Sequence, residues 1–495
     1  MALFEVKNLT FTYPNGEKPA LNGVNLTVNE GDFCLVLGAS GSGKSTLLRL
    51  LKKEIAPFGT ADGEINVNAE NVAFVNQNVE SNIVTDTVVG ELAFALENAQ
   101  REKNEIALKI AEVASYFNLN SVFNERVENL SGGTKQMLSL ASALTVNPGA
   151  LILDEPTSQL DPASAENFEN MVIKLNRDEG MTVLVSEHRA QNLLGLASKI
   201  LYLENGRSML FGSAKEYADY LIKTNSNFKL SLPAYTLAMK SAPTDFISAK
   251  ENAHELEIKP ITENTEKFEV ALNAKRLAFS YGKGQGDVLF NLDYKAYKGK
   301  INVIVGANGC GKTTLLKALA GVLKCYSGKI KATGKMCYMP QNVETMFLKD
   351  TVSAELEGNG ELIEKFNLGH LKGQNPFDLS GGEAQRLALA KALATGADIL
   401  LLDEPTKSVD AVFKVQFAQM LKDLSNEGKT VIIVTHDLEF AGEWADYVSF
   451  LFDKNIIAFA ERRKFFSALT TYTTALSRLT NGRAVSLSDV RWRDE

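Results

Sequence analysis

Short apolar runs recur along the chain, and each ends at a polar or glycine-rich segment. Residues 33–37 and 301–305, for example, are apolar at nearly every position, and a stretch with helical spacing follows each of them. Continuous apolar strands of this length are typical of parallel sheets, which helices cover on both faces. The pattern therefore predicts an α/β fold with mainly parallel sheets. Such sheets bind ligands at the carboxyl ends of their strands, where the polar segments fall.

The same order of runs and polar segments occurs twice in the 495 residues. Phe-Thr-Tyr at 11–13 is repeated as Phe-Ser-Tyr at 279–281, and the same spacing separates each tyrosine from the lysine of a glycine-rich loop. We therefore predict one domain at residues 1–225 and a second at residues 268–495. Residues 226–267 are expected to form a linker and a helical extension, and the second domain is expected to end in a helical extension of its own.

Composition excludes several classes of protein. The chain has 45% hydrophobic and 23% charged residues, with no run of 18 apolar residues and no N-terminal export signal. This composition is typical of a globular protein without a membrane span of its own. The four cysteines show no CxxC spacing and no disulfide framework, which fits a reducing cytoplasm. A net charge of −8 argues against general binding to a nucleic-acid backbone.

Both halves contain a G-x-x-x-x-G-K-[ST] loop between an apolar strand and a helix. Glycines in such a P-loop let backbone N–H groups converge on phosphate oxygens, and the helix N-terminus adds its dipole. We predict that Lys44 and Lys312 reach the β- and γ-phosphates of a nucleotide, and that Ser45 and Thr313 ligate Mg²⁺. The predicted nucleotide-binding residues of the two loops are Gly38, Ala39, Ser40, Gly41, Ser42, Gly43, Lys44, Ser45, Thr46, Gly306, Ala307, Asn308, Gly309, Cys310, Gly311, Lys312, Thr313 and Thr314.

Two pairs of acidic residues follow apolar strands. Asp154 and Asp403 each end such a strand. A carboxylate there is costly to bury unless it meets a cation, so we predict that each helps to hold Mg²⁺ together with the hydroxyl of its P-loop. Glu155 and Glu404 come one residue later, where a carboxylate can polarise an attacking water. A solvated loop acid is the alternative interpretation for these two glutamates.

His188 and His436 each end a β-branched strand in the corresponding place of the two halves. A neutral imidazole there can donate to a γ-phosphate or orient a water, so we predict both histidines to be catalytic, together with the two glutamates. The halves differ at the next position, where Arg189 stands in the first and Asp437 in the second. This difference predicts unequal turnover at the two sites.

The order of the motifs resembles that of the nucleotide-binding domain of an ABC ATPase. Each half has a P-loop, then a glutamine, then Leu-Ser-Gly-Gly-x-x-Gln, then Asp-Glu-Pro and finally a histidine. The Leu-Ser-Gly-Gly-x-x-Gln phrases at 130–136 and 379–385 are the specific part, because a P-loop and an acidic strand end occur in many NTPases. Two copies cover nearly the whole chain. The resemblance implies two P-loop ABC ATPase domains in tandem. Each is expected to have a mainly parallel sheet core, an antiparallel β subdomain and a helical subdomain.

The resemblance also implies roles for single residues. The two glutamates after the strand-ending aspartates match the catalytic bases of the family. Tyr13 and Tyr281 match the aromatic residue that stacks on adenine, although packing in the core is the alternative. Gln77 and Gln341 match a glutamine that touches Mg²⁺ or water and senses a membrane partner, so we include both among the predicted metal-site residues.

The Leu-Ser-Gly-Gly phrases resemble a second phosphate cradle, which in this family faces the γ-phosphate bound by the opposite domain. Its predicted residues are Ser131, Gly132, Gly133, Ser380, Gly381 and Gly382. One ATP is then expected between Lys44 and Ser380, and the other between Lys312 and Ser131. Both domains belong to one chain, so no homodimer is required to build the two sites.

The segment after Gln77 is similar to the corresponding stretch of energy-coupling-factor (ECF) and cobalt-type importer ATPases. In those proteins it lines a groove that takes a coupling helix from a transmembrane subunit. An apolar floor and an acidic rim would suit such a helix, and ordinary core periodicity is the alternative. The residues concerned are Val88, Leu92, Phe94 and Leu96 for the floor, and Glu91 and Glu97 for the rim. The second half departs from this pattern, and we expect about one helix to be missing there.

The resemblance implies an ATP-hydrolysing subunit of an ECF-type importer for a vitamin or metal ion, at the cytoplasmic face of the membrane. Its expected partners are an integral membrane coupling subunit and a substrate-binding membrane subunit, with Mg²⁺ as cofactor and no nucleic acid. Both sites keep the catalytic residue types, so both are expected to hydrolyse ATP. One alternative is the ATPase of a sugar-type importer, which tends to have one degraded site. Another is a soluble ribosome-associated ABC ATPase, whose usually basic linker contrasts with the acidic one here.

Overall fold

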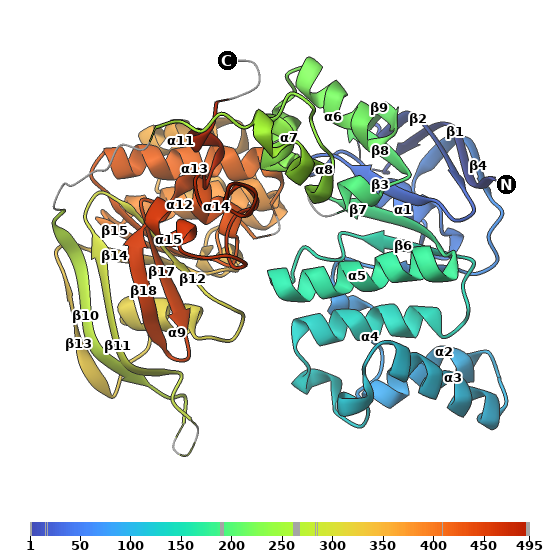
Figure 1. The fold of residues 1–495 in the computed structure, drawn as a ribbon, viewed down its shortest axis with the longest axis horizontal. Helices are drawn as coiled ribbons and strands as arrows, with labels where there is room; N and C mark the ends of the chain where they lie inside the picture. The colour runs from blue at the N-terminus through green and yellow to red at the C-terminus, as the bar shows by residue number, and fades with distance from the viewer. Residues whose placement is uncertain are drawn as a thin grey trace. The chain divides into compact units, whose positions relative to one another are not determined.

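The computed structural model describes residues 2–14, 16, 18–188, 193–260, 268–282, 284, 286–407 and 409–491, except for the side chain of Pro162. Packing divides the chain into two units (Figure 1). The first unit comprises Met1–Thr236 and Ala242–Ala249, and the second comprises Leu237–Ser241 and Lys250–Glu495. The chain therefore crosses between the units more than once in the region that the sequence marks as a linker.

The first unit contains a six-stranded sheet of order β5-β6-β7-β3-β8-β9 and a three-stranded antiparallel sheet of order β2-β1-β4. In the larger sheet every neighbouring pair is parallel except β8 and β9. The strands are β1 (Ala2–Thr12), β2 (Leu21–Asn29), β3 (Phe33–Leu37), β4 (Thr60–Val67), β5 (Val72–Val75), β6 (Ala150–Asp154), β7 (Thr182–Glu187), β8 (Lys199–Glu204) and β9 (Arg207–Gly212).

The second unit repeats this topology, with sheets of order β14-β15-β16-β12-β17-β18 and β11-β10-β13. Only β17 and β18 are antiparallel in its larger sheet. The strands are β10 (Val270–Phe279), β11 (Leu289–Tyr297), β12 (Ile301–Val305), β13 (Ser327–Ala332), β14 (Met336–Met339), β15 (Ile399–Asp403), β16 (Thr430–Val434), β17 (Tyr447–Phe452) and β18 (Asn455–Glu461). The prediction of two tandem α/β domains with parallel cores and antiparallel subdomains is confirmed.

Helices cover the larger sheet in each unit (Figure 1). Those of the first unit are α1 (Lys44–Leu50), α2 (Val88–Asn98), α3 (Lys103–Tyr116), α4 (Gly132–Leu144), α5 (Pro162–Glu179) and α6 (Ala214–Lys223), and the division between the units falls within α7 (Ala234–Ala238) and α8 (Phe246–Glu251). Those that follow are α9 (Lys312–Leu319), α10 (Val352–Glu355), α11 (Gly360–Lys365), α12 (Gly381–Ala394), α13 (Ala411–Asn426), α14 (Leu438–Trp444), α15 (Arg462–Ser467) and α16 (Ala475–Thr480).

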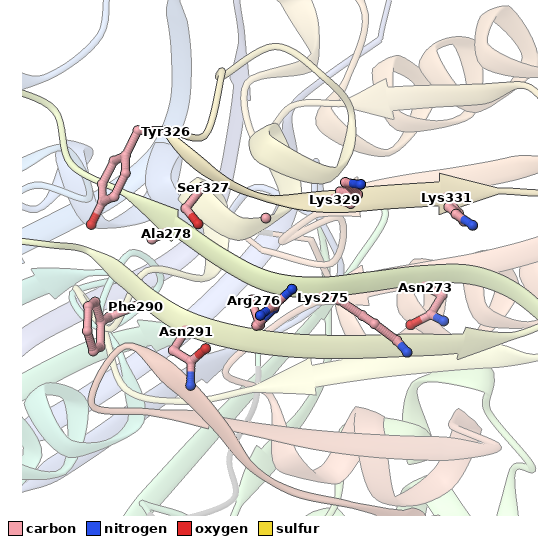
Figure 2. A pocket seen from close by; sticks show the side chains of 11 residues that line it. Asn273, Lys275, Arg276, Ala278, Phe290, Asn291, Tyr326, Ser327, Lys329 and Lys331 are labelled. Carbon is pink, nitrogen blue, oxygen red and sulfur yellow. The ribbon is translucent and has the colours of Figure 1, made fainter.

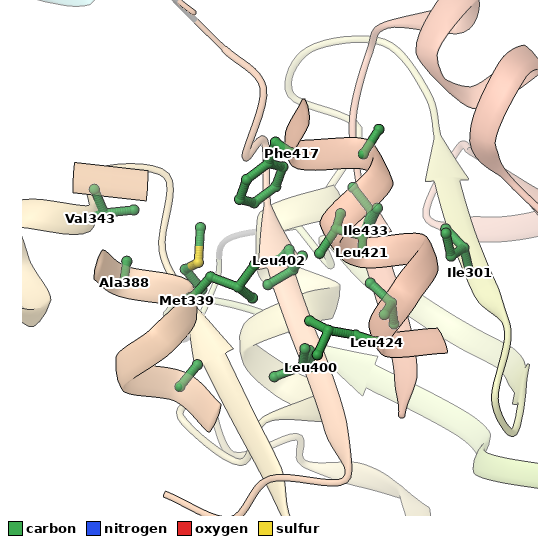
Figure 3. Packing of buried hydrophobic residues seen from close by; sticks show 14 of the residues in the cluster. Ile301, Met339, Val343, Ala388, Leu400, Leu402, Phe417, Leu421, Leu424 and Ile433 are labelled. Carbon is green, nitrogen blue, oxygen red and sulfur yellow. The ribbon is translucent and has the colours of Figure 1, made fainter. Parts of the chain in front are cut away.

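The central strands of the second unit pack against two different hydrophobic clusters. Leu400 and Leu402 of β15 face a cluster that includes Phe417 and Leu421 of α13 (Figure 3). Leu401, between them, belongs to the cluster formed with α9 and the antiparallel sheet. Side chains alternate between the two faces of a strand, so an unbroken apolar run is required where both faces are covered. This burial explains the continuous apolar runs of the sequence.

Side-chain caps fix the starts of the helices that follow the motifs. Ser131 caps α4, and Ser380 caps α12 in a capping box with Glu383. Asp161 caps α5, and Asp410 caps α13 in the same place of the second unit. Caps of this type typically stabilise a helix by about 1 kcal/mol each. The polar motif residues therefore set where each helix begins.

The segment between the glutamine and the Leu-Ser-Gly-Gly phrase differs most between the units. In the first unit α2 has 11 residues and α3 has 14. In the second, α10 has 4 residues and α11 has 6. The sequence comparison predicted that about one helix is missing, but the second unit keeps both helices and shortens each.

Short helices lie in both regions that the sequence marks as extensions. In each region a buried threonine donates to a carbonyl further along the chain: Thr236 Oγ1 to Pro243 O at 2.6 Å, and Thr474 Oγ1 to Val485 O at 2.7 Å. Beyond α8, Ile258 forms an antiparallel bridge with Val490. The described part of the linker is therefore folded rather than an extended tether. Residues 261–267 of the predicted linker lie outside the described residues.

Candidate active sites

The two P-loops lie between β3 and α1 and between β12 and α9, as predicted. Gly43 and Gly311 precede the two helices with φ angles of 101° and 103°, a conformation that favours glycine. At Gly43 a Cβ atom would also lie only 2.7 Å from the carbonyl oxygen of Ala20. The loop can therefore keep its backbone N–H groups exposed to a phosphate only with glycine at this position.

The lysine of the first P-loop lies at the centre of a network of polar groups. Lys44 Nζ donates to the carbonyl oxygens of Gly38 at 2.9 Å and Ala39 at 3.1 Å. It also lies 3.3 Å from Nδ1 of His188 and 3.5 Å from Oε1 of Glu155. The structure thus brings the lysine to a glutamate and a histidine that each lie more than a hundred residues further along the chain.

Glu155 is buried and held by three side chains of the first unit. Its Oε1 atom lies 2.8 Å from His188 Nε2, and its Oε2 atom accepts a hydrogen bond from Gln77 Nε2 at 2.9 Å. Burial acts to raise the pKa of Glu155, but the hydrogen bond and charge of His188, together with Lys44, outweigh it and lower the pKa. The carboxylate is therefore ionised at neutral pH, as a general base requires.

The second unit arranges the same residue types differently. Lys312 Nζ donates to the carbonyl oxygens of Gly306 at 2.9 Å and Ala307 at 3.0 Å. His436 approaches Glu404 through Nδ1, at 2.9 Å, whereas His188 uses Nε2. Among the described residues Gln341 has no hydrogen-bond partner and is exposed, so the second unit lacks the glutamine contact of the first. Among the described residues the glutamate and the histidine therefore meet in both units, whereas the lysine and the glutamine contact that glutamate only in the first.

Both glutamates have an unusual backbone conformation. Glu155 and Glu404 each have a φ angle of 48°, in the left-handed region that costs a non-glycine residue roughly 1–2 kcal/mol. Such strain is concentrated at functional sites, where surrounding contacts hold it in place. This feature is shared by both units and was not visible in the sequence.

The strand-ending aspartates meet the P-loop hydroxyls. Ser45 Oγ donates to Asp154 Oδ1 at 2.9 Å, and Thr313 Oγ1 donates to Asp403 Oδ1 at 3.0 Å. Burial raises the pKa of both aspartates, and hydrogen bonds from hydroxyl groups offset part of that rise. A hydroxyl and a carboxylate at one point form a hard oxygen donor set, which suits Mg²⁺. The described residues contain no cluster of three or more His, Cys, Asp or Glu side chains arranged to hold a metal.

A second hydroxyl group reaches each aspartate, and the sequence analysis missed both. Ser186 Oγ of β7 donates to Asp154 Oδ1 at 2.7 Å. In the second unit the phenol of Tyr338, on β14, donates to Asp403 Oδ2 at 3.0 Å. Burial and the neighbouring Asp403 raise the pKa of Tyr338, so the phenol keeps its proton. In the sequence, the only sign of these two donors is a hydroxyl-bearing residue within an otherwise apolar strand.

The two tyrosines before the P-loops are accessible. Tyr13 is 40% exposed and its hydroxyl lies 3.0 Å from Thr46 Oγ1, while Tyr281 is 60% exposed and lies 2.9 Å from Thr314 Oγ1. Each ring also packs edge-on against the phenylalanine two residues earlier. This exposure favours the interpretation of a ring available for stacking over the alternative of core packing.

The Leu-Ser-Gly-Gly residues do not join the P-loop of their own unit. Ser131 Oγ lies 2.8 Å from Thr134 Oγ1, and Ser380 Oγ donates to Glu383 Oε2 at 2.6 Å. Among the described residues these hydroxyl contacts stay within the first turn of α4 and α12. Both serines are exposed, with Gly132 and Gly381 exposed beside them. Arg189, which the sequence singled out beside His188, lies outside the described residues.

A basic hollow of about 730 Å³ lies on the antiparallel sheet of the second unit, and none of the predicted site residues lines it (Figure 2). Lys275 of β10 stands opposite Lys329 of β13, and Arg276 and Lys331 add two more cations. The corresponding pair in the first unit is Lys7 and Glu64, which have opposite charges. The duplication has therefore preserved the ATP-site residues but not the charge of this outer face.

Comparison with known proteins places the chain among relatives that share the duplicated motifs. The family model described as ABC transporter matches residues 21–158 and 289–407. A Bacillus anthracis protein, provisionally named an ABC transporter ATP-binding protein, is 36% identical over 96% of this chain and 94% of its own. The chain belongs to the ABC transporter family. It is an ATPase of that family with two nucleotide-binding units in tandem.

Two further comparisons add detail. A Bacillus subtilis protein, YkoD, provisionally named an HMP/thiamine import ATP-binding protein, is 29% identical over 94% of this ABC ATPase and 93% of its own chain. The crystal structure of an archaeal ribosome recycling factor, solved in complex with a ribosomal stalk protein, has a TM-score of 0.66 at 23% identity. That alignment covers 93% of this chain and 91% of the factor. At this identity the likeness shows the shared fold alone.

In the described part of the ABC ATPase, no helix is both long enough and apolar enough to cross a membrane.

A buried acid beside the first site of the ABC ATPase gives a testable pH dependence. Glu187 precedes His188, accepts a hydrogen bond from Thr157 Oγ1 at 2.8 Å and is 6% exposed. Burial raises the pKa of Glu187 to about 8. The folded protein therefore keeps a proton that the unfolded chain releases near pH 4.5. Stability should fall as pH rises from about 4.5 to 8, by up to about 1.4 kcal/mol per pH unit.

We predict that Glu187→Gln flattens the decline of the unfolding midpoint between pH 5 and pH 8, because the amide keeps an acceptor for Thr157 and carries no charge. Thermal unfolding of both proteins across that range measures the difference, which should stop growing above pH 8. Exposed Glu97→Gln is the matched control. Parallel curves for Glu187→Gln and the unsubstituted protein would contradict the prediction.

Proposed function

We propose that this ABC ATPase is the ATP-hydrolysing subunit of an ECF-type membrane importer for a vitamin or metal ion. The proposal is supported by transport names among relatives that span nearly the whole chain. It is also supported by an exposed apolar loop that both units present beside the predicted glutamines. The expected location is the cytoplasmic face of the membrane, with an integral coupling subunit and a substrate-binding membrane subunit as partners.

The loop after each glutamine is the observation that carries the proposal. Glu91 is buried on α2, and its Oε2 atom accepts hydrogen bonds from the backbone N–H groups of Val84 at 3.0 Å and Thr85 at 2.9 Å. Glu355 of the second unit accepts from the backbone of Leu348 in the same way. These bonds hold a loop whose apolar tip faces solvent: Val84 is 65% exposed and Leu348 is 82% exposed.

This geometry corrects the predicted groove. Val88, Leu92 and Leu96 are core residues of the first unit rather than a groove floor. Glu91 is only 2% exposed, so it anchors the loop and does not form an acidic rim. Phe94, at 38% exposed, is the one predicted floor residue among these that reaches solvent. Exposed apolar side chains on loops that such hydrogen bonds hold in place suit contact with an apolar partner surface such as a coupling helix.

The chemistry of ATP hydrolysis follows from the assembled side chains. Lys44 and Lys312 pair with the β- and γ-phosphates, and the backbone N–H groups of the P-loops hold the remaining oxygens. Glu155 and Glu404 accept a proton from the attacking water, and His188 and His436 orient the carboxylates and the γ-phosphate. Mg²⁺, held at Ser45 and Asp154 and at Thr313 and Asp403, would neutralise charge on the phosphate oxygens.

The sites are proposed to be composite. The exposed serine and glycines at the start of α4 and α12 supply backbone donors at helix N-termini, which suit a phosphate bound by the other unit. One ATP then lies between Lys44 and Ser380, and the other between Lys312 and Ser131. One chain holds both units at an effective concentration in about the millimolar range, so a homodimer is not needed.

Two other functions are less well supported. A sugar-type importer ATPase tends to have one degraded site, whereas both units here keep the lysine, aspartate, glutamate and histidine in the sequence, and the glutamate contacts the histidine in each. A ribosome-associated function would use a basic linker, but Glu251, Glu255 and Glu257 outnumber Lys250 and Lys259 around the end of α8. No structural observation favours either function.

We predict that Val84→Asp combined with Leu348→Asp abolishes co-purification of a small integral membrane protein and leaves basal ATPase activity unchanged. The two carboxylates would have to be desolvated in an apolar interface. Tagged protein recovered from detergent-solubilised membranes and identified by mass spectrometry measures the loss. Ile247→Asp, which alters an exposed apolar residue of α8, is the matched control. Recovery of ribosomal proteins instead of a membrane subunit would overturn the proposed function.

A further inference from the structure

The aspartate at each site receives two hydrogen bonds from hydroxyl groups, and only one of these is common to both sites. The shared bond comes from the P-loop, from Ser45 to Asp154 and from Thr313 to Asp403. The second donor is Ser186 in the first unit and Tyr338 in the second. These two donors come from strands on opposite sides of the aspartate-bearing strand.

Strand register shows that the donors have exchanged places. Asp154 pairs with Ser186 across β6 and β7, and Asp403 pairs with Val434 at the same position of β15 and β16. On the other side, Tyr338 pairs with Leu401, and its counterpart Phe74 pairs with Ile152. Each unit thus has a hydroxyl at one of the two positions and an apolar side chain at the other.

The exchange changes how the carboxylate is held. In the first unit both hydroxyls donate to Oδ1 of Asp154, and no described residue donates to Oδ2. In the second unit Thr313 donates to Oδ1 and Tyr338 to Oδ2, so Asp403 is fixed through both oxygens. Hydrogen bonds from outside the ligand set fix the orientation of a metal-binding carboxylate and commonly change metal affinity 10- to 100-fold when removed.

We propose that Tyr338 is a positioning residue for Mg²⁺ at the second site, where it performs the task that Ser186 performs at the first. This inference rests on the proposed function, since it requires Mg²⁺-dependent nucleotide binding at the P-loop of the second unit. The two sites thereby hold the same metal through carboxylates that are oriented by different strands. The edge strand β14 contributes to the second site, and β7 contributes to the first.

The test isolates the second site by placing every variant in a Lys44→Ala background. Binding of a fluorescent ATP analogue is measured at increasing Mg²⁺ concentration and again in EDTA. We expect Tyr338→Phe, which keeps the ring and removes the donor, to raise the Mg²⁺ concentration for half-maximal binding about 10-fold. Binding in EDTA should stay unchanged, because it does not depend on the orientation of Asp403 toward a metal. The thermal unfolding midpoint should fall modestly, because a hydrogen bond to a buried carboxylate is lost.

A rescue experiment separates positioning from packing. Val434→Ser introduces the donor of the first site on the other side of Asp403, so it should restore the Mg²⁺ requirement of Tyr338→Phe. Val434→Ala, which makes similar room without a hydroxyl, should not. The mirror experiment in a Lys312→Ala background uses Ser186→Val, with Phe74→Tyr as its rescue.

The outcomes distinguish this inference from the proposed function. An unchanged Mg²⁺ requirement in Tyr338→Phe, or an equal loss of binding in EDTA, would overturn the role of Tyr338. Equal rescue by serine and alanine would also overturn it, since packing alone would then explain the effect. If the background protein itself shows no Mg²⁺-dependent nucleotide binding, the proposed function of the second site fails instead.

Discussion

Replacing both Glu155 and Glu404 with glutamine is expected to stop ATP hydrolysis while ATP binding is retained. Each glutamate is the ionisable group that His188 or His436 contacts directly, and neither provides a donor for a phosphate. Removal of a positioned general base typically lowers turnover by about 10²- to 10⁴-fold. Glutamine has nearly the same shape, so the strained backbone at φ 48° and the surrounding contacts should persist.

An assay of phosphate release measures ATP hydrolysis, and binding of a fluorescent ATP analogue measures whether nucleotide binding is retained. The single variants report how much turnover each unit supplies, and the differing contacts of Gln77 and Gln341 predict that the two values are unequal. Gln77→Ala is a useful companion, since it removes a contact to Glu155 without removing the carboxylate. Unimpaired hydrolysis in the double variant would show that the glutamates are not the bases.

Local patterns predicted most of the fold and much of the site. The continuous apolar runs at 33–37 and 301–305 became central strands, and the P-loops, strand-ending aspartates and histidines assembled within each unit. These predictions depend on residues next to each other in the sequence, or on a duplicated order of motifs. Local sequence and the order of motifs can both be used without knowing how the side chains pack.

The predictions that failed required knowledge of what surrounds a side chain. Glu91 was assigned to a solvent-facing rim because it is charged, but backbone N–H groups of the neighbouring loop satisfy its carboxylate in the interior. Tyr338 was not singled out at all, because its contact with Asp403 spans 65 residues. No local pattern records such a contact, since it depends on the register of two strands.

Ser380→Arg is expected to damage the nucleotide site of Lys44 and to spare the site of Lys312. Ser380 is exposed at the start of α12, beside Gly381. In the proposed composite arrangement it would contact the γ-phosphate held by the first P-loop, and a long side chain there would displace the phosphate from the helix N-terminus. Loss of one such set of donors typically costs about 10²- to 10³-fold in turnover, so hydrolysis at that site should become undetectable beside the intact one.

Photocrosslinking of a nucleotide analogue, followed by proteolysis between the units, shows which P-loop is labelled. Ser380→Arg should remove label from the fragment that contains Lys44, and the mirror variant Ser131→Arg should remove it from the fragment that contains Lys312. The reciprocal pair matters because a general loss of folding would reduce both labels together. If each arginine instead affected the P-loop of its own unit, the sites would not be composite. The two ATPase units would then have to act separately on their partner.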